Sequence, residues 1–246
     1  MSEKIKTRIF INQNLECAQI VIPNETQSHY LNNVLRVNNG DKVAAFDGES
    51  GEFLFEILKN NKRNIQLQKI SKIKNFYLPP DLWLLFAPVK KDKTDFIIQK
   101  SGELGVRKIV PVITERTICE RIKIERYQAQ IIEACEQCGR VDIPQISEPI
   151  SFAKLIENWD NRTLFFMDET GNGDDIYQSF AGTKPSAAIL VGPEGGFAAE
   201  ELNKLRQMNC AKGVSMGKRI LRAETAVAAA ISCWQAICGD WVNMEK

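Results

Sequence analysis

The sequence predicts an α/β protein in which a small all-β domain precedes a parallel α/β domain. Up to Ile70 the apolar residues fall in short runs separated by Asn, Gly and Asp, which is typical of a β-barrel or sandwich. A lysine-rich stretch closed by Pro79 and Pro80 follows. Beyond it, strand patterns alternate with longer helical patterns, as in parallel sheets. We therefore expect two domains, at residues 1–72 and 73–246.

Four apolar runs in the first domain predict strands: AQIVI, DKVAAFDG, GEFLFEILK and NIQLQKI. Between the first two, SHYLNNVLRV places Leu31, Val34 and Leu35 at helical spacing. Ser28 is the expected N-cap of this helix, and the Asn-Asn-Gly step that ends in Gly40 is its expected end.

Strands and helices alternate regularly in the second domain. The expected strands are LWLLFAPV, KIVPVI, TLFFMD, AAILV and GVSM. Helices are expected within DKTDFIIQKSGELG, ended by Gly105, in a longer segment ended by Gly139, and after Ser151 as an N-cap. AEELNKLRQM and ETAVAAAISCWQAI complete the set. This order predicts a parallel sheet covered by helices on both faces.

Composition excludes several classes of protein. The chain is 44% hydrophobic and 26% charged, which is ordinary for a globular protein. No apolar run is long enough to span a bilayer, and the N-terminus has no export signal, so we expect a cytoplasmic protein.

The cysteines and the net charge narrow the function less strongly. Seven cysteines fit a reducing compartment. Cys135 and Cys138 form a C-x-x-C, but His29 is the only histidine, so we expect no metal site. The net charge of +1 combines a basic first half with an acidic remainder, which permits contact with a polyanion without requiring it.

The stretch VGPEGGF, Val191 to Phe197, ends the strand AAILV with three glycines, a proline and a carboxylate. At the carboxyl end of a parallel strand, glycine lets backbone amides approach a ligand. Glu194 argues against a phosphate there, because a carboxylate repels an anion. A polar ligand without strong negative charge is favoured. The alternative is a tight turn with Glu194 serving the next helix N-terminus.

A second segment, SMGKRILRAETA, also resembles a binding loop. Its apolar Ile220-Leu221 step suits a flat ring such as adenine, whereas in a purely structural role these residues would be core and Arg222 a solvated charge. It is not a P-loop, because the glycine spacing is wrong and Arg219 stands at the hydroxyl position. The stretch GNGDDI matches two glycines of a dinucleotide fingerprint but has Ile176 at the third, which favours a surface turn.

With these two loops, and with HYLNNVLRVNNGD, QKSGELGV and EACEQCGRVDIP in the same order, the chain resembles the bacterial 16S ribosomal RNA uridine-N3 methyltransferase family (RsmE) of the SPOUT superfamily. The resemblance covers nearly the whole chain. It implies a PUA-like β-barrel that binds RNA, followed by a SPOUT α/β methyltransferase domain with a trefoil knot. It also implies a homodimer that acts on 16S rRNA in the small ribosomal subunit.

In this family S-adenosylmethionine lies bent in the knot. The positions of this chain that match its site are Leu190, Gly192, Pro193, Glu194, Gly195, Gly196, Met216, Gly217, Ile220, Leu221 and Thr225. RNA contacts are expected at Arg8, Arg36, Lys93 and Arg140. For Lys93 and Arg140, dimer packing is the alternative.

Methylation of uridine N3 requires loss of its imide proton, and a guanidinium is suited to the charge that spreads onto the carbonyl oxygens. Arg222 is the expected stabiliser. Glu224 or Glu194 is the expected base, although Glu224 also fits the first turn of the last helix. Two other functions stay open at this point: a non-catalytic rRNA-binding protein on the same scaffold, and an NAD-dependent oxidoreductase built on GNGDDI.

Overall fold

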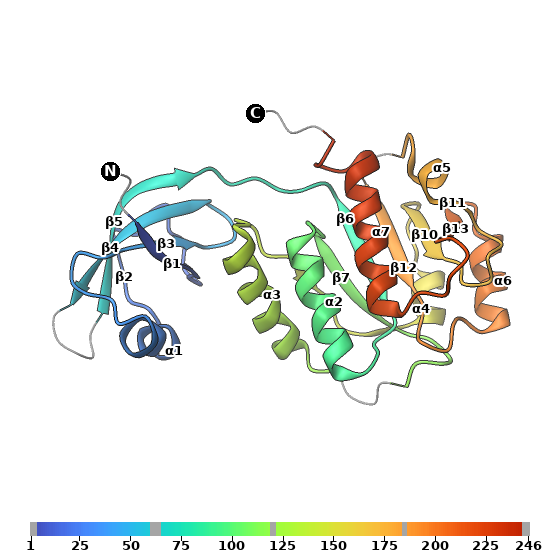
Figure 1. Ribbon diagram of the computed structural model, residues 1–246, viewed down its shortest axis with the longest axis horizontal. Coiled ribbons are helices and arrows are strands. Elements are labelled where there is room, and N and C mark those ends of the chain that lie inside the picture. Colours follow the sequence, from blue (N-terminus) through green and yellow to red (C-terminus); the bar gives the residue numbers. More distant parts are fainter. Residues whose placement is uncertain (1–3, 60–64, 119–121, 184–185, 243–246) are drawn as a thin grey trace. The chain divides into compact units, whose positions relative to one another are not determined.

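The computed structural model of the chain describes residues 4–59, 65–118, 122–183 and 186–242. Contacts divide it into two units (Figure 1), one of Met1–Leu78 with Cys135–Ile143 and one of Pro79–Ala134 with Pro144–Lys246. The expected class is confirmed, because a sheet domain precedes a parallel-sheet α/β domain. No helix among the described residues is long and apolar enough to cross a membrane, and they contain no cluster of metal-ligating side chains.

The first unit is built on a five-stranded sheet in the order β1-β3-β4-β5-β2. β1 pairs with β3 in parallel, whereas the other neighbours are antiparallel. Alternating side chains of the strands enter one apolar core, with Phe55 and Leu67 fully buried in it. The strands are β1 Ile5–Phe10, β2 Ile20–Val21, β3 Lys42–Phe46, β4 Glu52–Lys59 and β5 Ile65–Lys74.

The helix of this unit begins and ends earlier than the sequence suggested. α1 covers Glu25–His29 and continues as the π-helical turn η1, Tyr30–Val34. Its N-cap is Asn24, whose side chain accepts from the backbone N–H of Gln27 at 2.9 Å in a capping box. The prediction of Ser28 as the cap is therefore wrong, and so is the Asn-Asn-Gly end.

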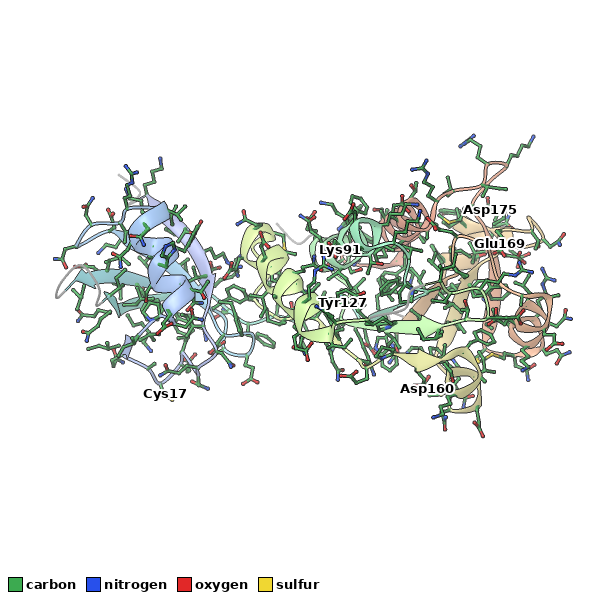
Figure 2. All side chains as sticks on the ribbon, turned by 90° about the horizontal axis from the view of Figure 1, so that it is seen from below. Cys17, Lys91, Tyr127, Asp160, Glu169 and Asp175 are labelled. Carbon is green, nitrogen blue, oxygen red and sulfur yellow. The ribbon has the colours of Figure 1, made fainter. Side chains whose placement is uncertain are left out.

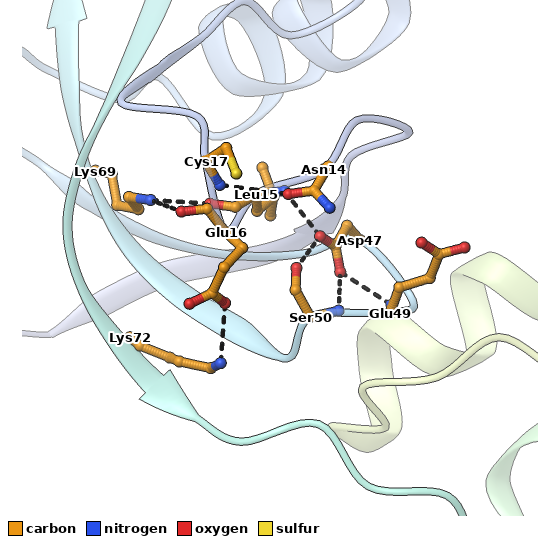
Figure 3. A network of polar contacts seen from close by, with 9 residues as sticks. All are labelled: Asn14, Leu15, Glu16, Cys17, Asp47, Glu49, Ser50, Lys69 and Lys72. Atoms are coloured by element: carbon orange, nitrogen blue, oxygen red, sulfur yellow. Dashed lines mark hydrogen bonds and ion pairs between the residues drawn. The ribbon is translucent and has the colours of Figure 1, made fainter.

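The carboxylate of Asp47 holds two loops of the first unit together (Figure 3). It accepts from the backbone N–H groups of Leu15 at 2.8 Å, Ser50 at 2.7 Å and Glu49 at 3.0 Å. Partial burial alone would raise the pKa of Asp47, but these hydrogen bonds outweigh it and the pKa lies below its ordinary value. The charged form of Asp47 thus orders the loop between β3 and β4.

Arg8 on β1 explains why Cys135–Ile143 packs with the first unit. Its Nε donates to Glu52 at 2.7 Å, and its terminal nitrogens donate to the backbone carbonyls of Cys135 and Arg140. The guanidinium also lies over the ring of Phe46, 3.8 Å from its centroid. Because the last carbonyls of a helix lack intrahelical partners, the guanidinium satisfies a group that would otherwise be unpaired.

The second unit contains a parallel sheet in the order β11-β13-β10-β12-β6-β7-β8, with β9 also paired to β7. Its central strands are buried on both faces, as their continuous apolar sequences predicted. The GVSM strand ends one residue earlier than expected, at Ser215. The strands are β6 Leu82–Phe86, β7 Lys108–Ile113, β8 Gln145–Ile146, β9 Ile150–Ser151, β10 Thr163–Met167, β11 Asp174–Asp175, β12 Ala187–Val191 and β13 Ala211–Ser215.

Helices cover both faces of this sheet, as expected. α2 and α7 pack against each other on one face (Figure 1), and side chains of α4 and α6 enter the core cluster on the other. Gly105 and Gly139 adopt φ of 80° and 79° just after α2 and α3, which confirms their role as terminators. The knot stays a prediction. The helices are α2 Lys91–Glu103, α3 Ile124–Cys138, α4 Phe152–Glu157, α5 Ile176–Phe180, α6 Ala199–Gln207 and α7 Ala223–Cys238.

Candidate functional site

A cavity of about 560 Å³ lies at the carboxyl ends of β10, β12 and β13 in the second unit. Strand order explains its position: β10 pairs with β12 on one side and β13 on the other, so three consecutive strand ends meet at one edge. In parallel sheets this edge is the usual place for a ligand. The cavity is within the size range of small-molecule sites.

Two glycine-containing segments, separated in the sequence, both form parts of the cavity wall. We call residues 192–197 the first loop and residues 216–222 the second loop. From the first loop the lining residues are Gly192, Pro193, Glu194 and Gly196, and from the second they are Met216, Gly217, Lys218, Arg219, Ile220, Leu221 and Arg222.

The first loop is held by the protein around it. Gly196 has φ of +69°, and its N–H donates to the carbonyl of Pro193 at 2.9 Å. A Cβ on Gly196 would lie 2.4 Å from Oε1 of Glu169, which follows β10 (Figure 2) and accepts from the N–H of Phe197 at 2.9 Å. On Gly192 a Cβ would come 2.9 Å from the ring of Phe197. Glycine is thus required here by neighbouring protein groups, in addition to any ligand.

The second loop has a different character. Gly217 has φ of +90°, and no atom of the described residues lies within 4 Å of the position its Cβ would take. Ile220 is 90% exposed although it is a large apolar side chain. The interpretation of Ile220 as a core residue is therefore wrong. Arg222, also exposed, is the N-cap position of α7.

Charge in the cavity is arranged around Glu194. Its carboxylate forms an ion pair with Lys93 on α2. The hydrogen bond from Lys93, together with the charges of Lys90 and Arg222, holds the pKa of Glu194 below its ordinary value. Glu194 is therefore ionised at neutral pH, and its charge is balanced by Lys93 and by the nearby charges of Lys90 and Arg222.

Asp168 anchors the segment that follows β10. It is 5% exposed and accepts from Nη2 of Arg206 on α6 and from the N–H of Thr170, both at 2.9 Å. Burial alone would raise the pKa of Asp168, but the hydrogen bonds from Arg206 and Thr170 outweigh it and the pKa lies below its ordinary value. The anchored segment also carries Glu169, which supports the first loop.

The cavity does not include every residue expected from the sequence. Leu190, on β12, is fully buried in the apolar core of the second unit. The carbonyl of Gly195 accepts from Nη1 of Arg116 at 2.9 Å, outside the cavity lining. Thr225 and Glu224 lie in the first turn of α7, also outside the lining; Oε2 of Glu224 is buried without a hydrogen-bond partner among the described residues.

Other lining residues were not identified from the sequence. The segment Met167–Gly171 contributes a third part of the wall, and Lys93, which was assigned to RNA contact, lies there as well. GNGDDI was interpreted as a surface turn, yet Gly171 reaches the cavity. The sequence contained one signal for this segment: TLFFMD is a buried strand that is followed directly by polar residues. Its relevance depended on strand order, which a local pattern does not specify.

The residues expected to contact RNA fall into two groups. Arg8 and Arg140 are engaged by the protein: Arg8 as described above, and Arg140, 5% exposed, through two hydrogen bonds to Asp142 at 2.6 and 2.8 Å. Neither offers an uncommitted guanidinium to a phosphate. Arg36 is exposed at φ of 52°, and Lys93 is half-buried in its ion pair with Glu194. Only Arg36 of the four thus presents an exposed charge.

Comparison with known families identifies both parts of the chain. Residues 77–235 match the model of the RNA methyltransferase domain, and residues 22–70 match the model of the RNA methyltransferase PUA domain. Ribosomal RNA small subunit methyltransferase E of Rickettsia conorii is 34% identical over 227 residues, which is 92% of this chain and 93% of that protein. The protein of the same description from Buchnera aphidicola subsp. Schizaphis graminum is 32% identical, covering 95% and 97%.

Solved structures show the same fold over nearly the whole length. A ribosomal RNA small subunit methyltransferase E from Neisseria gonorrhoeae, bound to S-adenosyl methionine, superposes with a TM-score of 0.85 at 30% identity, covering 96% of this chain and 99% of that chain. A methyltransferase from Legionella pneumophila in complex with the same cofactor gives a TM-score of 0.84 at 28% identity, with 95% and 98% covered.

Proposed function

This chain belongs to the ribosomal RNA small subunit methyltransferase E family, and on that premise we propose that it transfers a methyl group from S-adenosylmethionine to N3 of a specific uridine in 16S rRNA. The observation that carries the proposal is the meeting of the first and second loops around one cavity at the sheet edge. If these loops lay apart, or if side chains filled the space between them, the chain would have no site for the cofactor.

The chemistry of the cavity fits S-adenosylmethionine. Carboxylates of Asp168 and Glu169 lie on one part of the wall, where they suit hydroxyl and ammonium donors, and Arg219 and Arg222 lie on another, where they suit a carboxylate. The exposed side chain of Ile220 offers an apolar surface to an adenine ring. When bound, the cofactor supplies an electrophilic methyl group, so the protein's own residues have to orient the uracil and manage its N3 proton.

Arg222 is the proposed stabiliser of the uracil anion. Its side chain is exposed at the cavity, and its charge contributes to the lowered pKa of Glu194. A guanidinium remains charged at every relevant pH and donates in a fixed plane, so it suits the negative charge that forms on the carbonyl oxygens beside N3.

Glu224 is the proposed proton acceptor, with Glu194 as the alternative. Glu194 is already neutralised by Lys93, and its lowered pKa makes it a weaker base. Glu224 stands two residues beyond Arg222, outside the cavity lining, and its buried Oε2 has no hydrogen-bond partner among the described residues. Replacement of Glu224 by Gln should therefore lower kcat more than replacement of Glu194 by Gln, and the reverse order would exchange their roles.

We assign the remaining features of the family to this chain in the same proposal. They are an RNA-binding domain at 1–72, a methyltransferase domain at 73–246 with a trefoil knot, a homodimer, and action in the cytoplasm on 16S rRNA of the small subunit. The two family-model matches, at residues 22–70 and 77–235, support the order of the domains. Light scattering of the purified protein tests the dimer.

The activity is tested by transfer of tritium from labelled S-adenosylmethionine to small ribosomal subunits from cells that lack this methylation. We expect one labelled uridine, located by mass spectrometry of the digested rRNA. Replacement of Arg222 by Gln should lower kcat about 100-fold or more while the cofactor Kd changes little. Cofactor and rRNA binding without transfer by the wild-type protein would instead indicate the non-catalytic alternative.

A further inference from the structure

A second, smaller cavity adjoins the one described above and shares Pro193 and Glu194 with it. Its volume of about 140 Å³ is that of about four to five water molecules. The other lining residues come from the start of α2 and from the segment after β7, and they are Pro88, Val89, Lys90, Lys91, Arg116 and Ile118.

Three of these lining residues, Lys90, Lys91 and Arg116, are exposed cations. Among the described residues, Lys90 and Lys91 form no ion pair within 4.0 Å, whereas Lys93, two positions further on, is occupied by Glu194. Arg116 is held in place by its hydrogen bond to the carbonyl of Gly195 at 2.9 Å. The cavity therefore combines two uncommitted ammonium groups with one positioned guanidinium.

The backbone adds to this positive charge. Lys90 is the N-cap position of α2, a helix of 13 residues, and Lys91 is its first helical residue (Figure 2). The first N–H groups of a helix have no intrahelical partner, and the helix dipole places partial positive charge at the same end. Lysines at a helix N-terminus are unfavourable for the helix itself, so their placement here is better explained by an anion than by helix stability.

The carboxylates near the cavity do not cancel this charge. Glu194, the one acidic residue among the described lining residues, is paired with Lys93 and lies within the influence of Lys90 and Arg222. Asp92, in the same helical turn, is exposed and outside the lining. Among the described lining residues, a group that enters the cavity thus meets three cations and one carboxylate that is already paired.

The geometry points to a binding site for one RNA backbone phosphate, formed by Lys90, Lys91 and Arg116, beside the cavity where the uracil is methylated. This inference rests on the proposed function. The shared Pro193-Glu194 wall places the phosphate next to the reacting base, so one contact holds the nucleotide while the neighbouring cavity holds its base and the cofactor. The sequence-based prediction had assigned RNA contact to Lys93, whereas here its two lysine neighbours make that contact.

A carboxylate of the cofactor is the other anion that this cavity has to be tested against. The exposure of Lys90 and Lys91 favours the RNA backbone, because phosphates are bound mainly by solvent-facing Lys and Arg in a salt-dependent manner. An enclosed cofactor carboxylate would be better served by Arg219 or Arg222, which line the larger cavity.

The experiment compares the double variant Lys90→Gln/Lys91→Gln with the charge-preserving Lys90→Arg/Lys91→Arg. Lys154→Gln/Lys204→Gln, which changes two exposed lysines on α4 and α6, is the matched control. KM and kcat are measured with undermethylated small subunits over a series of salt concentrations, and calorimetry gives the Kd of S-adenosylmethionine. Equilibrium binding of the same subunits is measured in parallel, so the result does not depend on methyl transfer.

We expect the Gln pair to raise KM and the subunit Kd about tenfold. The slope of log Kd against log salt should become shallower by about 0.7, which corresponds to one phosphate contact on single-stranded RNA. kcat and the cofactor Kd should stay within about twofold of wild type, and the Arg pair and the control should behave as wild type.

Two results would overturn the site: subunit binding and salt slope unchanged in the Gln pair, or a rise in the cofactor Kd that matches the rise in KM. The second result would assign the lysines to the cofactor. If the wild-type protein binds subunits without methylating them, the proposed function fails. The phosphate site is then still tested by comparing the salt dependence of subunit binding between wild type and the Gln pair.

Discussion

The two loops that form the candidate cofactor cavity differ in how the protein supports them. The first loop has a turn closed by its own backbone, a carbonyl held by Arg116 and an N–H held by Glu169. The second loop has open space beside Gly217 and an apolar side chain, Ile220, that is 90% exposed. One wall is therefore preorganised, and the other has surface that a ligand can cover. Because the first loop is already ordered, ligand binding costs little conformational entropy there, whereas the second loop has no such advantage.

The largest effect is expected from Gly196→Ala, because the new Cβ meets Glu169 and an L-residue is strained at φ of +69°. The φ strain alone should lower the free energy of unfolding by about 1–3 kcal/mol, and displacement of Glu169 should add a loss of cofactor affinity of at least about tenfold. Urea unfolding and calorimetry measure the two effects.

Two other glycines isolate the strain at Gly196. Gly182 has φ of +71° and Gly217 has φ of +90°, and no atom of the described part of the chain lies within 4 Å of either Cβ position. Their Ala variants should show the φ penalty without the clash, and Gly182→Ala should bind the cofactor as wild type does. If Gly196→Ala were no worse than Gly182→Ala in both measurements, the described support of the first loop would be incorrect.

Asp168→Asn tests the anchor beneath the preorganised wall. Loss of the charge-assisted bond from Arg206 should lower the free energy of unfolding by about 1–3 kcal/mol at pH 7. Because the folded pKa of Asp168 lies below its ordinary value, this stabilisation is complete above about pH 5 and is lost as the pH falls through the folded pKa.

Urea unfolding of wild type and Asp168→Asn, from neutral to acidic pH, measures the difference in their free energies of unfolding. It should shrink as the pH falls below the ordinary Asp pKa. Asp174→Asn, which changes an exposed carboxylate on β11, serves as the control and should show no such trend. A difference between wild type and Asp168→Asn that stayed constant down to acidic pH would contradict the role of the charge.

Ile220→Ala tests the open wall. Because the side chain is exposed, the free energy of unfolding should change by less than about 0.5 kcal/mol. The cofactor Kd should nevertheless rise about threefold to tenfold, since a bound ring would cover apolar surface that the variant lacks. Calorimetry and urea unfolding together decide this, and an unchanged Kd would mean that Ile220 does not face the ligand.

A small effect on stability is also expected from Glu194→Gln. Its ion pair with Lys93 is partly solvated, and such pairs contribute about 0–1 kcal/mol, less at high salt. Lys93→Gln should have the same effect, and the double variant should be no worse than either single one. A large stability loss in urea unfolding would show that this pair supports the first loop more strongly than Asp168 does.

Much of the fold follows from local patterns. The apolar runs TLFFMD and AAILV became β10 and β12, and Gly105 and Gly139 ended the helices they follow. Helix starts were less certain, because Asn24 and Ser28 both suit an N-cap and only the capping box with Gln27 distinguishes them. Such choices depend on a few hydrogen bonds whose free energies are similar.

The site was only partly predictable. Both loops were identified, but Met167–Gly171 was missed, and Leu190 and Thr225 lie outside the cavity lining. Arg8 and Arg140 show the same difficulty, because an arginine that binds a phosphate and one that binds a helix end look alike in a sequence. Which partner each finds depends on long-range contacts.

By itself, the sequence determined most of the strands and helices, the two glycine loops and the family, because periodicity, turn residues and motifs act over short distances along the chain. It did not predict the strands β1, β8, β9 and β11 or the helix α5. Tertiary structure decided that β10 separates β12 from β13, that Cys135–Ile143 joins the first unit, and that Glu194 neutralises Lys93 while Lys90 and Lys91 stay exposed. The physical reason is that these outcomes depend on which distant groups become neighbours, and strand pairing, burial and charge pairing select those neighbours only in the folded chain.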